Sequence, residues 1–180
     1  MTHPLFAFFS QIRLFSQLDA DELNEFLRAV QPVQLDANRR VFATNDPGDS
    51  AFVIENGRVD ITLPGEHGPI VVASLGAGEV FGEIALLDGG PRSATATTAA
   101  PTRLLRIDKS EFDFLRRNFR PAGYKIIRAI TTTVTQRIRL SNQRIARLLS
   151  DETVEAPTAP STGSKNRKSF LQRMFSSPDD

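Results

Sequence analysis

The residues best suited to chemistry lie in one segment, 81–95, which reads Phe-Gly-Glu-Ile-Ala-Leu-Leu-Asp-Gly-Gly-Pro-Arg-Ser-Ala-Thr. Its one cation, Arg92, carries a planar guanidinium that suits phosphate oxygens, and Ser93 can add a hydroxyl donor. Glu83 would repel a phosphate, but its oxygens can accept hydrogen bonds from a sugar hydroxyl. One acceptor and one cation at this spacing therefore fit a ribose cyclic phosphate.

Small residues in the same segment leave backbone groups within reach of a ligand. Gly82 has no Cβ, so the chain can pass close to a bound molecule there, and Ala94 keeps the backbone similarly accessible. Residues Ile84 to Leu87 can form a single helical turn whose first N–H groups point at an anion. The predicted site thus combines side-chain and main-chain donors.

Two helices are expected to precede this segment. Apolar residues near the N-terminus recur at three- and four-residue spacing, which predicts an amphipathic helix: Leu5, Phe8, Phe9, Ile12 and Phe15. Asp19 can cap a second helix that starts at Ala20 and extends to Val30. Pro32 is expected to end that helix.

Between residues 33 and 107 the pattern changes to that of short strands. Six runs rich in β-branched or aromatic residues are separated by turns: Arg40 to Ala43, Ala51 to Glu55, Arg58 to Leu63, Pro69 to Leu75, Ala94 to Thr98, and Thr102 to Ile107. Asn56 and Gly57, between the second and third runs, predict a type I′ hairpin. Many short strands at this spacing predict a small sandwich or jelly-roll barrel.

Helical spacing returns after the strands. Residues 112–115 carry two Phe and a Leu at positions that indicate a helix. A longer helix is expected from about Ala122 to Leu149, because Pro121 favours the first position of a helix. These helices would follow the barrel directly.

The chain is therefore expected to divide into a folded part and a tail. Residues 1–150 predict an α+β domain, a jelly-roll-like β-roll barrel flanked by N-terminal helices and a long C-terminal helix. Residues 151–180 begin with a flexible linker rich in Ser, Thr and Pro and continue into a basic stretch at 165–174.

The Phe-Gly-Glu segment resembles the phosphate-binding cassette of cyclic-nucleotide-binding domains, a family found in catabolite activator proteins, protein kinase A regulatory subunits and cyclic-nucleotide-gated channels. The family pattern is Phe-Gly-Glu-(apolar)-Ala-Leu and, a few residues later, Pro-Arg-(small)-Ala-Thr, and this sequence matches it without a gap. The resemblance implies that Glu83 binds the ribose 2′-hydroxyl and Arg92 the cyclic phosphate of cAMP or cGMP. It also implies that the amides near Ala85, Ser93 and Ala94, with the Ser93 hydroxyl, complete the phosphate site.

The resemblance extends over most of the chain. Residues 14–18 resemble the family's opening helix, and residues 46–49 with residues 51–59 resemble its central hairpin. Asn38 and Asn45 stand where the family often has Gly. Because Asn tolerates a left-handed backbone, the same fold is expected.

The long helix has two candidate residues for contact with a ligand. In relatives a residue of this helix caps the base, and Arg128 falls near the matching place. Tyr124 lies four residues earlier on the same helical face. The alternative interpretation is a solvated Arg128 and a packing Tyr124. We expect ligand occupancy to be transmitted through this helix by one of them.

Apolar residues on the same helix predict a further contact. Two rows are present, one formed by Ile127, Val134, Ser141 and Leu148 and the other by Ile130, Thr131, Ile138 and Ile145. Such a stripe can pack on the barrel or pair with a second copy, and we expect a homodimer through residues 122–149. Four basic residues are interpreted as a solvated face: Arg137, Arg139, Arg144 and Arg147.

Composition and motifs favour a binding module over an enzyme. The formal net charge is +1, so the overall charge does not indicate a class of binding partner. The absence of Cys excludes disulfides and thiolate metal sites. The two histidines, His3 and His67, lie far apart, and no metal-ligand or nucleophile–base spacing occurs. We therefore predict no catalytic residues, no metal and no cofactor other than the nucleotide ligand.

The sequence predicts a stand-alone receptor that signals to a protein partner through its C-terminal helix. A transcription factor of the catabolite-activator type needs a helix-turn-helix of roughly 60 to 70 residues after the long helix. Only 30 residues follow Ser150, so DNA binding is not expected. A regulatory fragment or divergent member of such a factor, or of a channel, is the alternative. The N-terminus lacks the pattern of a signal peptide or membrane span, which predicts a cytoplasmic protein.

Overall fold

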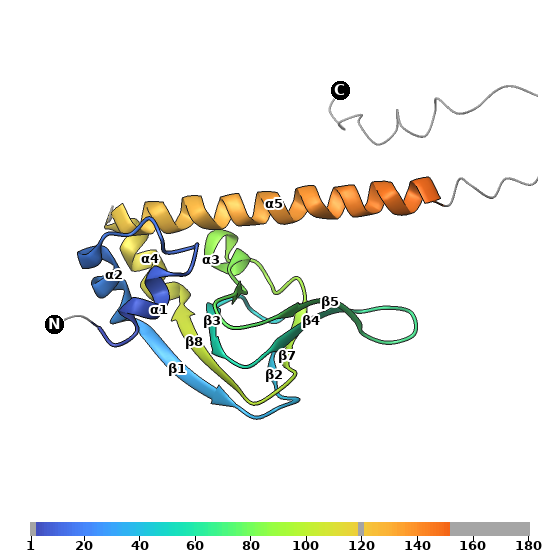
Figure 1. Cartoon of the computed structure of the whole chain (residues 1–180), viewed down its shortest axis with the longest axis horizontal. Helices are drawn as coiled ribbons and strands as arrows, with labels where there is room; N and C mark the ends of the chain where they lie inside the picture. The colour runs from blue at the N-terminus through green and yellow to red at the C-terminus, as the bar shows by residue number, and fades with distance from the viewer. Residues whose placement is uncertain (1–2, 119–120, 152–180) are drawn as a thin grey trace, which may run out of the picture. The chain divides into compact units, whose positions relative to one another are not determined.

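The computed structural model describes residues 3–118 and 121–151 (Figure 1). The chain forms two units, residues 1–140 and 141–180, and the first contains the elements around the candidate site. In chain order the elements are α1 (Phe6–Ser10), α2 (Ala20–Leu27), β1 (Val30–Leu35), β2 (Arg40–Phe42), β3 (Ser50–Asn56), β4 (Val59–Leu63), β5 (Ile70–Leu75), β6 (Val80–Phe81), α3 (Ile84–Asp88), β7 (Thr95–Thr98), β8 (Thr102–Asp108), α4 (Lys109–Arg117) and α5 (Pro121–Asp151).

The strands form two antiparallel sheets, in the orders β1-β8-β3-β6 and β2-β7-β4-β5. Apolar side chains from both sheets fill the space between them, and they include Phe52 and Leu104 from the first sheet and Val59 and Ala96 from the second. Short helices precede the sheets and a long helix follows them. This architecture confirms the predicted α+β roll.

The turn at Asn56 and Gly57 does not close a hairpin. β3 pairs with β8 and β6, whereas β4 pairs with β5 and β7, so the turn carries the chain from one sheet to the other. The predicted type I′ hairpin is therefore wrong. Gly57 is still required, because its φ is +101° and a Cβ there would lie 2.4 Å from the Thr102 hydroxyl oxygen. The dipeptide marks a turn, while the choice of pairing partner depends on contacts distant in sequence.

The start of α2 agrees with the sequence prediction. The Asp19 side chain accepts hydrogen bonds from the N–H groups of Asp21 and Glu22. The Glu22 carboxylate accepts one in return from the Asp19 N–H at 2.9 Å, which completes a capping box.

The end of α2 does not agree with the prediction. The helix ends at Leu27, and Val30 already begins β1, so the expected helical segment up to Val30 is wrong. Pro32 lies inside β1, opposite Leu105 of β8. Because β1 is an edge strand, the missing N–H of a proline there breaks no interior ladder. Pro32 therefore lies in an edge strand and does not end a helix.

Two asparagines occupy left-handed positions, as the sequence predicts. Asn38 has a φ of 59° and Asn45 a φ of 71°. Their N–H groups donate to the carbonyl oxygens of Thr98 at 2.7 Å and Arg92 at 2.9 Å. These loops therefore keep their backbone conformation without glycine.

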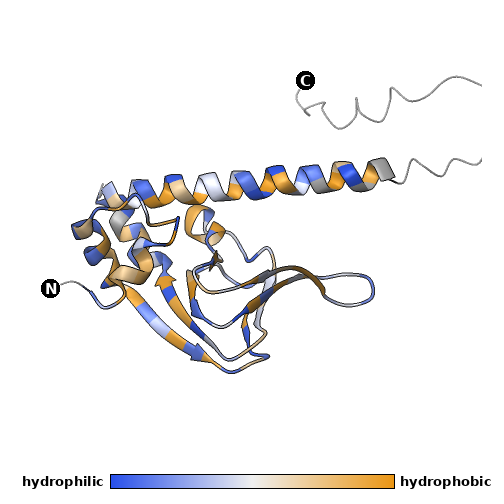
Figure 2. Ribbon diagram, viewed as in Figure 1, coloured by the Kyte–Doolittle hydropathy of each residue, from blue (hydrophilic) through white to orange (hydrophobic). Residues whose placement is uncertain are grey.

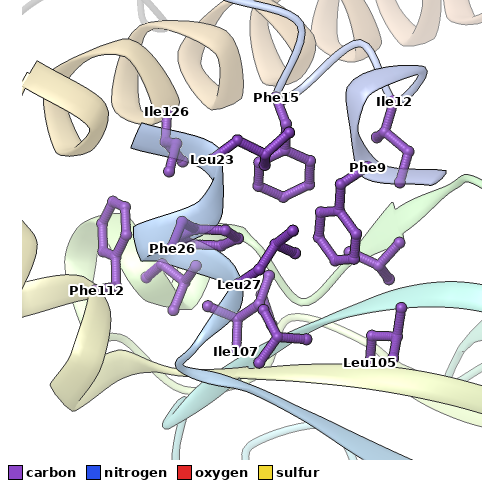
Figure 3. Close-up of a cluster of buried hydrophobic side chains, with 14 of the residues drawn as sticks. Phe9, Ile12, Phe15, Leu23, Phe26, Leu27, Leu105, Ile107, Phe112 and Ile126 are labelled. Carbon is purple, nitrogen blue, oxygen red and sulfur yellow. The ribbon is translucent and has the colours of Figure 1, made fainter. Parts of the chain in front are cut away.

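The helices share one apolar core with the first sheet. Figure 3 shows the rings of Phe9, Phe15 and Phe26 close together, with Phe112 of α4 and Ile126 of α5 beside them. The centroid of the Phe15 ring lies 4.9 Å from that of Phe9 and 5.1 Å from that of Phe26. Burying a side chain of this size stabilises a fold by about 1.5–3 kcal/mol. This core therefore joins α1, α2, α4 and the first turns of α5.

The predicted helix from Ala122 to Leu149 is confirmed, with observed bounds Pro121–Asp151. Ala122, Ile126 and Ile130 are buried at four-residue spacing, and Figure 2 shows polar and apolar residues alternating along the helix. Within the described residues, no helix is long and apolar enough to cross a membrane. The predicted linker and basic tail lie outside the described residues from residue 152 onward, and the boundary expected at residue 150 stays a prediction.

Candidate functional site

The candidate site is built on the cassette, defined here as residues 81–95. β6 leads into it, α3 forms its single helical turn as predicted, and β7 follows it. Gly82 has a φ of 72°, and Gly89 ends α3 with a φ of 68°. The N–H of Gly89 donates to the carbonyl oxygen of Ala85 at 3.0 Å. Two left-handed glycines therefore confine the helical turn to a few residues.

Arg92 is buried at the end of the cassette, with 4% of its surface exposed. Its Nη1 donates to the carbonyl oxygens of Ser50 at 2.6 Å and Gly82 at 3.1 Å. Its Nη2 donates to the Ser50 hydroxyl at 3.0 Å and to Asp49 Oδ1 at 3.3 Å. Four acceptors thus fix the guanidinium, and two of them belong to the backbone.

One donor of the Arg92 guanidinium is not used by the residues that the structure describes. Its Nε is buried and has no hydrogen-bond partner among the described residues. The guanidinium carbon lies 4.2 Å from the centroid of the Phe42 ring, which packs in a tilted arrangement against Phe52 and Phe81. A cation over an aromatic face is favourable, but it does not satisfy the Nε donor. That donor can serve an acceptor oxygen of a ligand.

Glycines allow the cassette to approach its neighbours. A Cβ on Gly82 would lie 2.8 Å from Arg92 Nη1, so the glycine makes room for the guanidinium itself. A Cβ on Gly48 would lie 2.4 Å from the Cβ of Ala85. The backbones of Arg92 and Asp46 are also joined, because the Arg92 N–H donates to the Asp46 carbonyl oxygen at 2.9 Å. The loop before β3 is therefore packed directly on the cassette.

Asp49 bridges two arginines and connects the cassette to β8. Its Oδ1 lies 3.3 Å from Arg92 Nη2, and its Oδ2 lies 3.1 Å from Arg106 Nη2. Burial alone would raise the pKa of Asp49, but the hydrogen bond from Ser50 and the charges of both arginines outweigh burial and lower this pKa. Burial lowers the pKa of Arg92, and the charge of Asp49 opposes that change. Asp49 thus stays ionised and supports the charged form of Arg92.

Glu83 stands immediately before α3 and is also buried, with 3% of its surface exposed. Its Oε1 accepts a hydrogen bond from Nη1 of Arg137 on α5 at 2.5 Å. Nη2 of Arg137 donates to the carbonyl oxygen of Val80 at 3.2 Å. Arg137 is exposed, as expected for a solvated face, but it also pairs with Glu83, which the sequence did not indicate. Arg139 and Arg147 are exposed.

The remaining predicted cassette residues differ in exposure. Ala85 is buried, Ala94 is half-buried and Ser93 is exposed, while Ile84 is 41% exposed. None of them carries a charge, so any contribution to anion binding comes from N–H groups and from the Ser93 hydroxyl.

Arg128 and Tyr124 lie on the exposed side of α5. Arg128 is two residues from both Ile126 and Ile130, which is about 200° around a helix with 3.6 residues per turn. Tyr124 is 70% exposed. Arg137 of α5 makes a polar contact with the cassette in this structure, whereas a contact between Arg128 and a ligand stays a prediction.

Three residues around the site were missed from the sequence: Asp49, Ser50 and Arg106. Their signal is weak, because each contacts Arg92 or its partner only through the folded sheet. Arg137 had a usable signal, since it lies seven residues after Ile130, on the same side of a helix. Because Arg137 is charged, it was assigned to the solvent-exposed face, and its spacing from Ile130 was not used.

Comparison with known proteins agrees with this geometry. Residues 32–119, which include the whole cassette, match the cyclic nucleotide-binding domain family model. These residues form a cyclic nucleotide-binding domain.

The domain has relatives in several kinds of protein. It is 32% identical to a cAMP-dependent protein kinase regulatory subunit of Dictyostelium discoideum, over 60% of this chain and 34% of the relative. It is 38% identical to a cyclic nucleotide-gated potassium channel of Rhizobium etli, over 58% of this chain and 28% of the channel. The catabolite activator protein of Thermus thermophilus is similar in structure, with a TM-score of 0.67 and 26% identity over 76% of this chain and 62% of that one. The chain spans about a third of the length of these two curated relatives.

Proposed function

We propose that the domain binds a cyclic mononucleotide, cAMP or cGMP, at the cassette. Arg92 would hold the cyclic phosphate through its charge and its free Nε, and Glu83 would accept a hydrogen bond from the ribose 2′-hydroxyl. The backbone at Gly82, Ile84, Ala85, Ser93 and Ala94 would complete the cradle, with N–H donors and the Ser93 hydroxyl. The names of the kinase subunit and the channel, which specify cAMP and cyclic nucleotides, support this ligand class.

One observation carries the proposal: a buried cation and a buried carboxylate stand nine residues apart on a cassette with left-handed glycines. Buried charges are costly unless they have partners, and a fold keeps them where they are useful. Arg92 still has an unused Nε donor among the described residues. A ligand with one anionic group and one neighbouring hydroxyl matches this pair.

The domain is proposed to act by binding and not by catalysis. Occupancy would be passed to a protein partner through α5, which contacts the cassette directly through Arg137. Exposed apolar residues on α5, among them Ile138 and Ile145, support a homodimer through residues 122–149. A cytoplasmic location fits a receptor for a second messenger. DNA binding is not part of this proposal.

The alternative function is a regulatory part of a longer protein, a transcription factor of the catabolite-activator type or a channel. The structural likeness to a catabolite activator protein favours this alternative over an enzyme. A gel-shift experiment with the full chain on random duplex DNA separates the two functions. Retarded DNA whose amount depends on cyclic nucleotide would favour the transcription factor.

Calorimetric titration of the full chain with cAMP, cGMP and a cyclic dinucleotide tests the proposal. Saturable one-site binding of a cyclic mononucleotide is expected, with weaker binding of 5′-AMP as a control because its phosphate is not closed into a ring with the 3′-oxygen and is therefore not held in the cyclic geometry. Binding of none of the cyclic mononucleotides would contradict the proposed function.

A further inference from the structure

Within the first unit, Lys125, Gln136 and Arg137 of α5 make polar contacts with other elements. Lys125 Nζ lies 2.6 Å from Glu22 of α2, and Arg13 donates to Gln136 at 3.1 Å. The third is the Arg137–Glu83 pair at 2.5 Å. The first two join α5 to the N-terminal segment, and only the third joins α5 to a residue proposed to touch the ligand.

The two partners of this third contact differ in their access to water. The Glu83 side chain is 5% exposed, whereas the Arg137 side chain is 48% exposed. A buried carboxylate needs a donor, but a half-exposed guanidinium can exchange its partner for water at little cost. Arg137 can therefore leave Glu83 whenever another donor takes its place.

Space beside Glu83 is limited while Arg137 is in place. Glu83 lines a cavity of about 160 Å³ whose α5 wall consists of Ile130, Thr133 and Arg137. Sites for small organic ligands usually enclose about 300–1,000 Å³. Arg92 does not line this cavity, whose other walls are residues 12–14 and 78–80, so it offers no room for a sugar between Glu83 and α5. Arg137 is the longest and most exposed side chain of the α5 wall.

We infer that Arg137 is an internal competitor for the ribose-binding carboxylate, so that cyclic nucleotide breaks the ion pair between α5 and the cassette. The inference rests on the proposed function, because it names Glu83 as the ribose acceptor. The sugar hydroxyl replaces the guanidinium as donor to Glu83, and Arg137 turns to solvent. α5 then keeps its contacts with Glu22 and Arg13, and Ile126 and Ile130 stay in the apolar core that also contains Leu86 of the cassette, but the ion pair with Glu83 is lost. A ligand shifts a helix only through such a difference between two states.

Calorimetry on the full chain and two variants tests this competition. Arg137→Ala should bind cAMP or cGMP up to about fivefold more tightly, since a partly exposed ion pair is worth at most about 1 kcal/mol. Arg139→Ala is the matched control, because it removes the same charge from an exposed position two residues away. Its affinity should equal that of the unmodified chain.

Whether Arg137→Ala raises or lowers the affinity for cyclic nucleotide decides whether Arg137 competes with the ligand. Weaker or unchanged binding by Arg137→Ala would show that Arg137 assists the ligand or has no part, and would leave the proposed function standing. Binding by Arg137→Ala alone would support both claims. No binding by any of the three proteins would remove the proposed function and the competition with it.

Hydrogen exchange supplies a second measurement that does not depend on affinity. Saturating nucleotide should speed amide exchange over residues 126–137 of the unmodified chain and leave that of Arg137→Gln nearly unchanged, since the glutamine lacks the charge of the ion pair. Slower exchange over these residues in the unmodified chain would overturn the inference, because the ligand would then tighten α5 on the cassette. A thermal melt of each variant shows whether it is folded.

Discussion

The two charged residues of the cassette are held in different ways. Arg92 is fixed by Asp49, by both oxygens of Ser50 and by the carbonyl of Gly82, all within the roll. Glu83 is held by one half-exposed side chain from α5. The end of the site proposed to bind the phosphate is therefore built into the sheets, whereas the end proposed to bind the sugar depends on a helix whose contact can be exchanged.

This difference suggests how a rigid roll can report a ligand. Moving Arg92 would break backbone contacts and leave buried acceptors unpaired, at about 1–3 kcal/mol for each lost partner. Moving Arg137 breaks the partly exposed pair with Glu83, at about 0.2–1 kcal/mol, and the hydrogen bond to the Val80 carbonyl oxygen. Affinity is then expected to come mainly from the Arg92 end, and conformational response mainly from the Glu83 end.

Arg92→Ala should cause the largest loss of binding. A charged hydrogen-bond partner contributes about 1.5–3 kcal/mol, so the affinity for cAMP or cGMP should fall about 10- to 150-fold. Arg103→Ala is the control, because Arg103 is an exposed cation on β8 that pairs with Glu55. Calorimetry measures both variants, and circular dichroism checks the fold. Equal losses in the two variants would contradict a special role for Arg92.

Gly82→Ala should cause the second largest loss of nucleotide affinity, because it both strains the backbone and crowds the Arg92 side chain. The left-handed conformation costs an alanine about 1–2 kcal/mol, and its Cβ would lie 2.8 Å from Arg92 Nη1. Gly78→Ala is matched, since Gly78 has a φ of 83° but no atom within 4 Å of the added Cβ. Both variants should lose similar thermal stability, but only Gly82→Ala should lose nucleotide affinity. Loss of affinity in both would assign the effect to strain alone.

The sequence grouped the cassette residues into one proposed site but did not indicate the neighbours that hold them. Gly82, Glu83 and Arg92 lie in one short segment, so their spacing alone indicated a common site. Asp49 and Arg106 reach the site through sheet pairing between β3 and β8, which local patterns do not specify. Arg137 lies 54 residues after Glu83, and its pairing depends on how α5 packs.

The same distinction explains the errors in the fold. The capping residue Asp19 and the left-handed Asn38 act through adjacent backbone and were predicted correctly. The partner of a strand after Asn56 depends on the whole sheet order, and the pairing predicted there was wrong. Pro32 was misassigned because an edge strand tolerates proline, and edge position is a property of the finished sheet.

Asp49→Asn should have a smaller effect at the phosphate end. Asp49 lies beside Arg92, but its side chain is 65% exposed, so we expect about a threefold loss of affinity. Because the pKa of Asp49 is lowered in the folded chain, its stabilising effect is present above the ordinary value of about 3.9 and is lost as pH falls through the lowered pKa. Urea unfolding measures the free energy of unfolding of variant and parent. The difference between these two free energies should be the same at about pH 7 and about pH 5, and it should vanish in strong acid. If the difference in free energy of unfolding disappeared between about pH 7 and about pH 5, the lowered pKa of Asp49 would be contradicted.

Glu83→Gln should have the smallest effect on affinity, about twofold or less, because two changes offset each other. The amide oxygen still accepts one hydrogen bond from the ribose hydroxyl, although more weakly than a carboxylate. The same substitution removes the charge that attracts Arg137, so less competition remains to be overcome. A 2′-deoxy nucleotide separates the two contributions: it should bind the parent chain poorly and lose little more with Glu83→Gln. Calorimetry with both ligands and both proteins gives the coupling between Glu83 and the 2′-hydroxyl. Purely additive losses would show that the two groups do not meet, and the sugar end of the site would then have to be assigned to another residue.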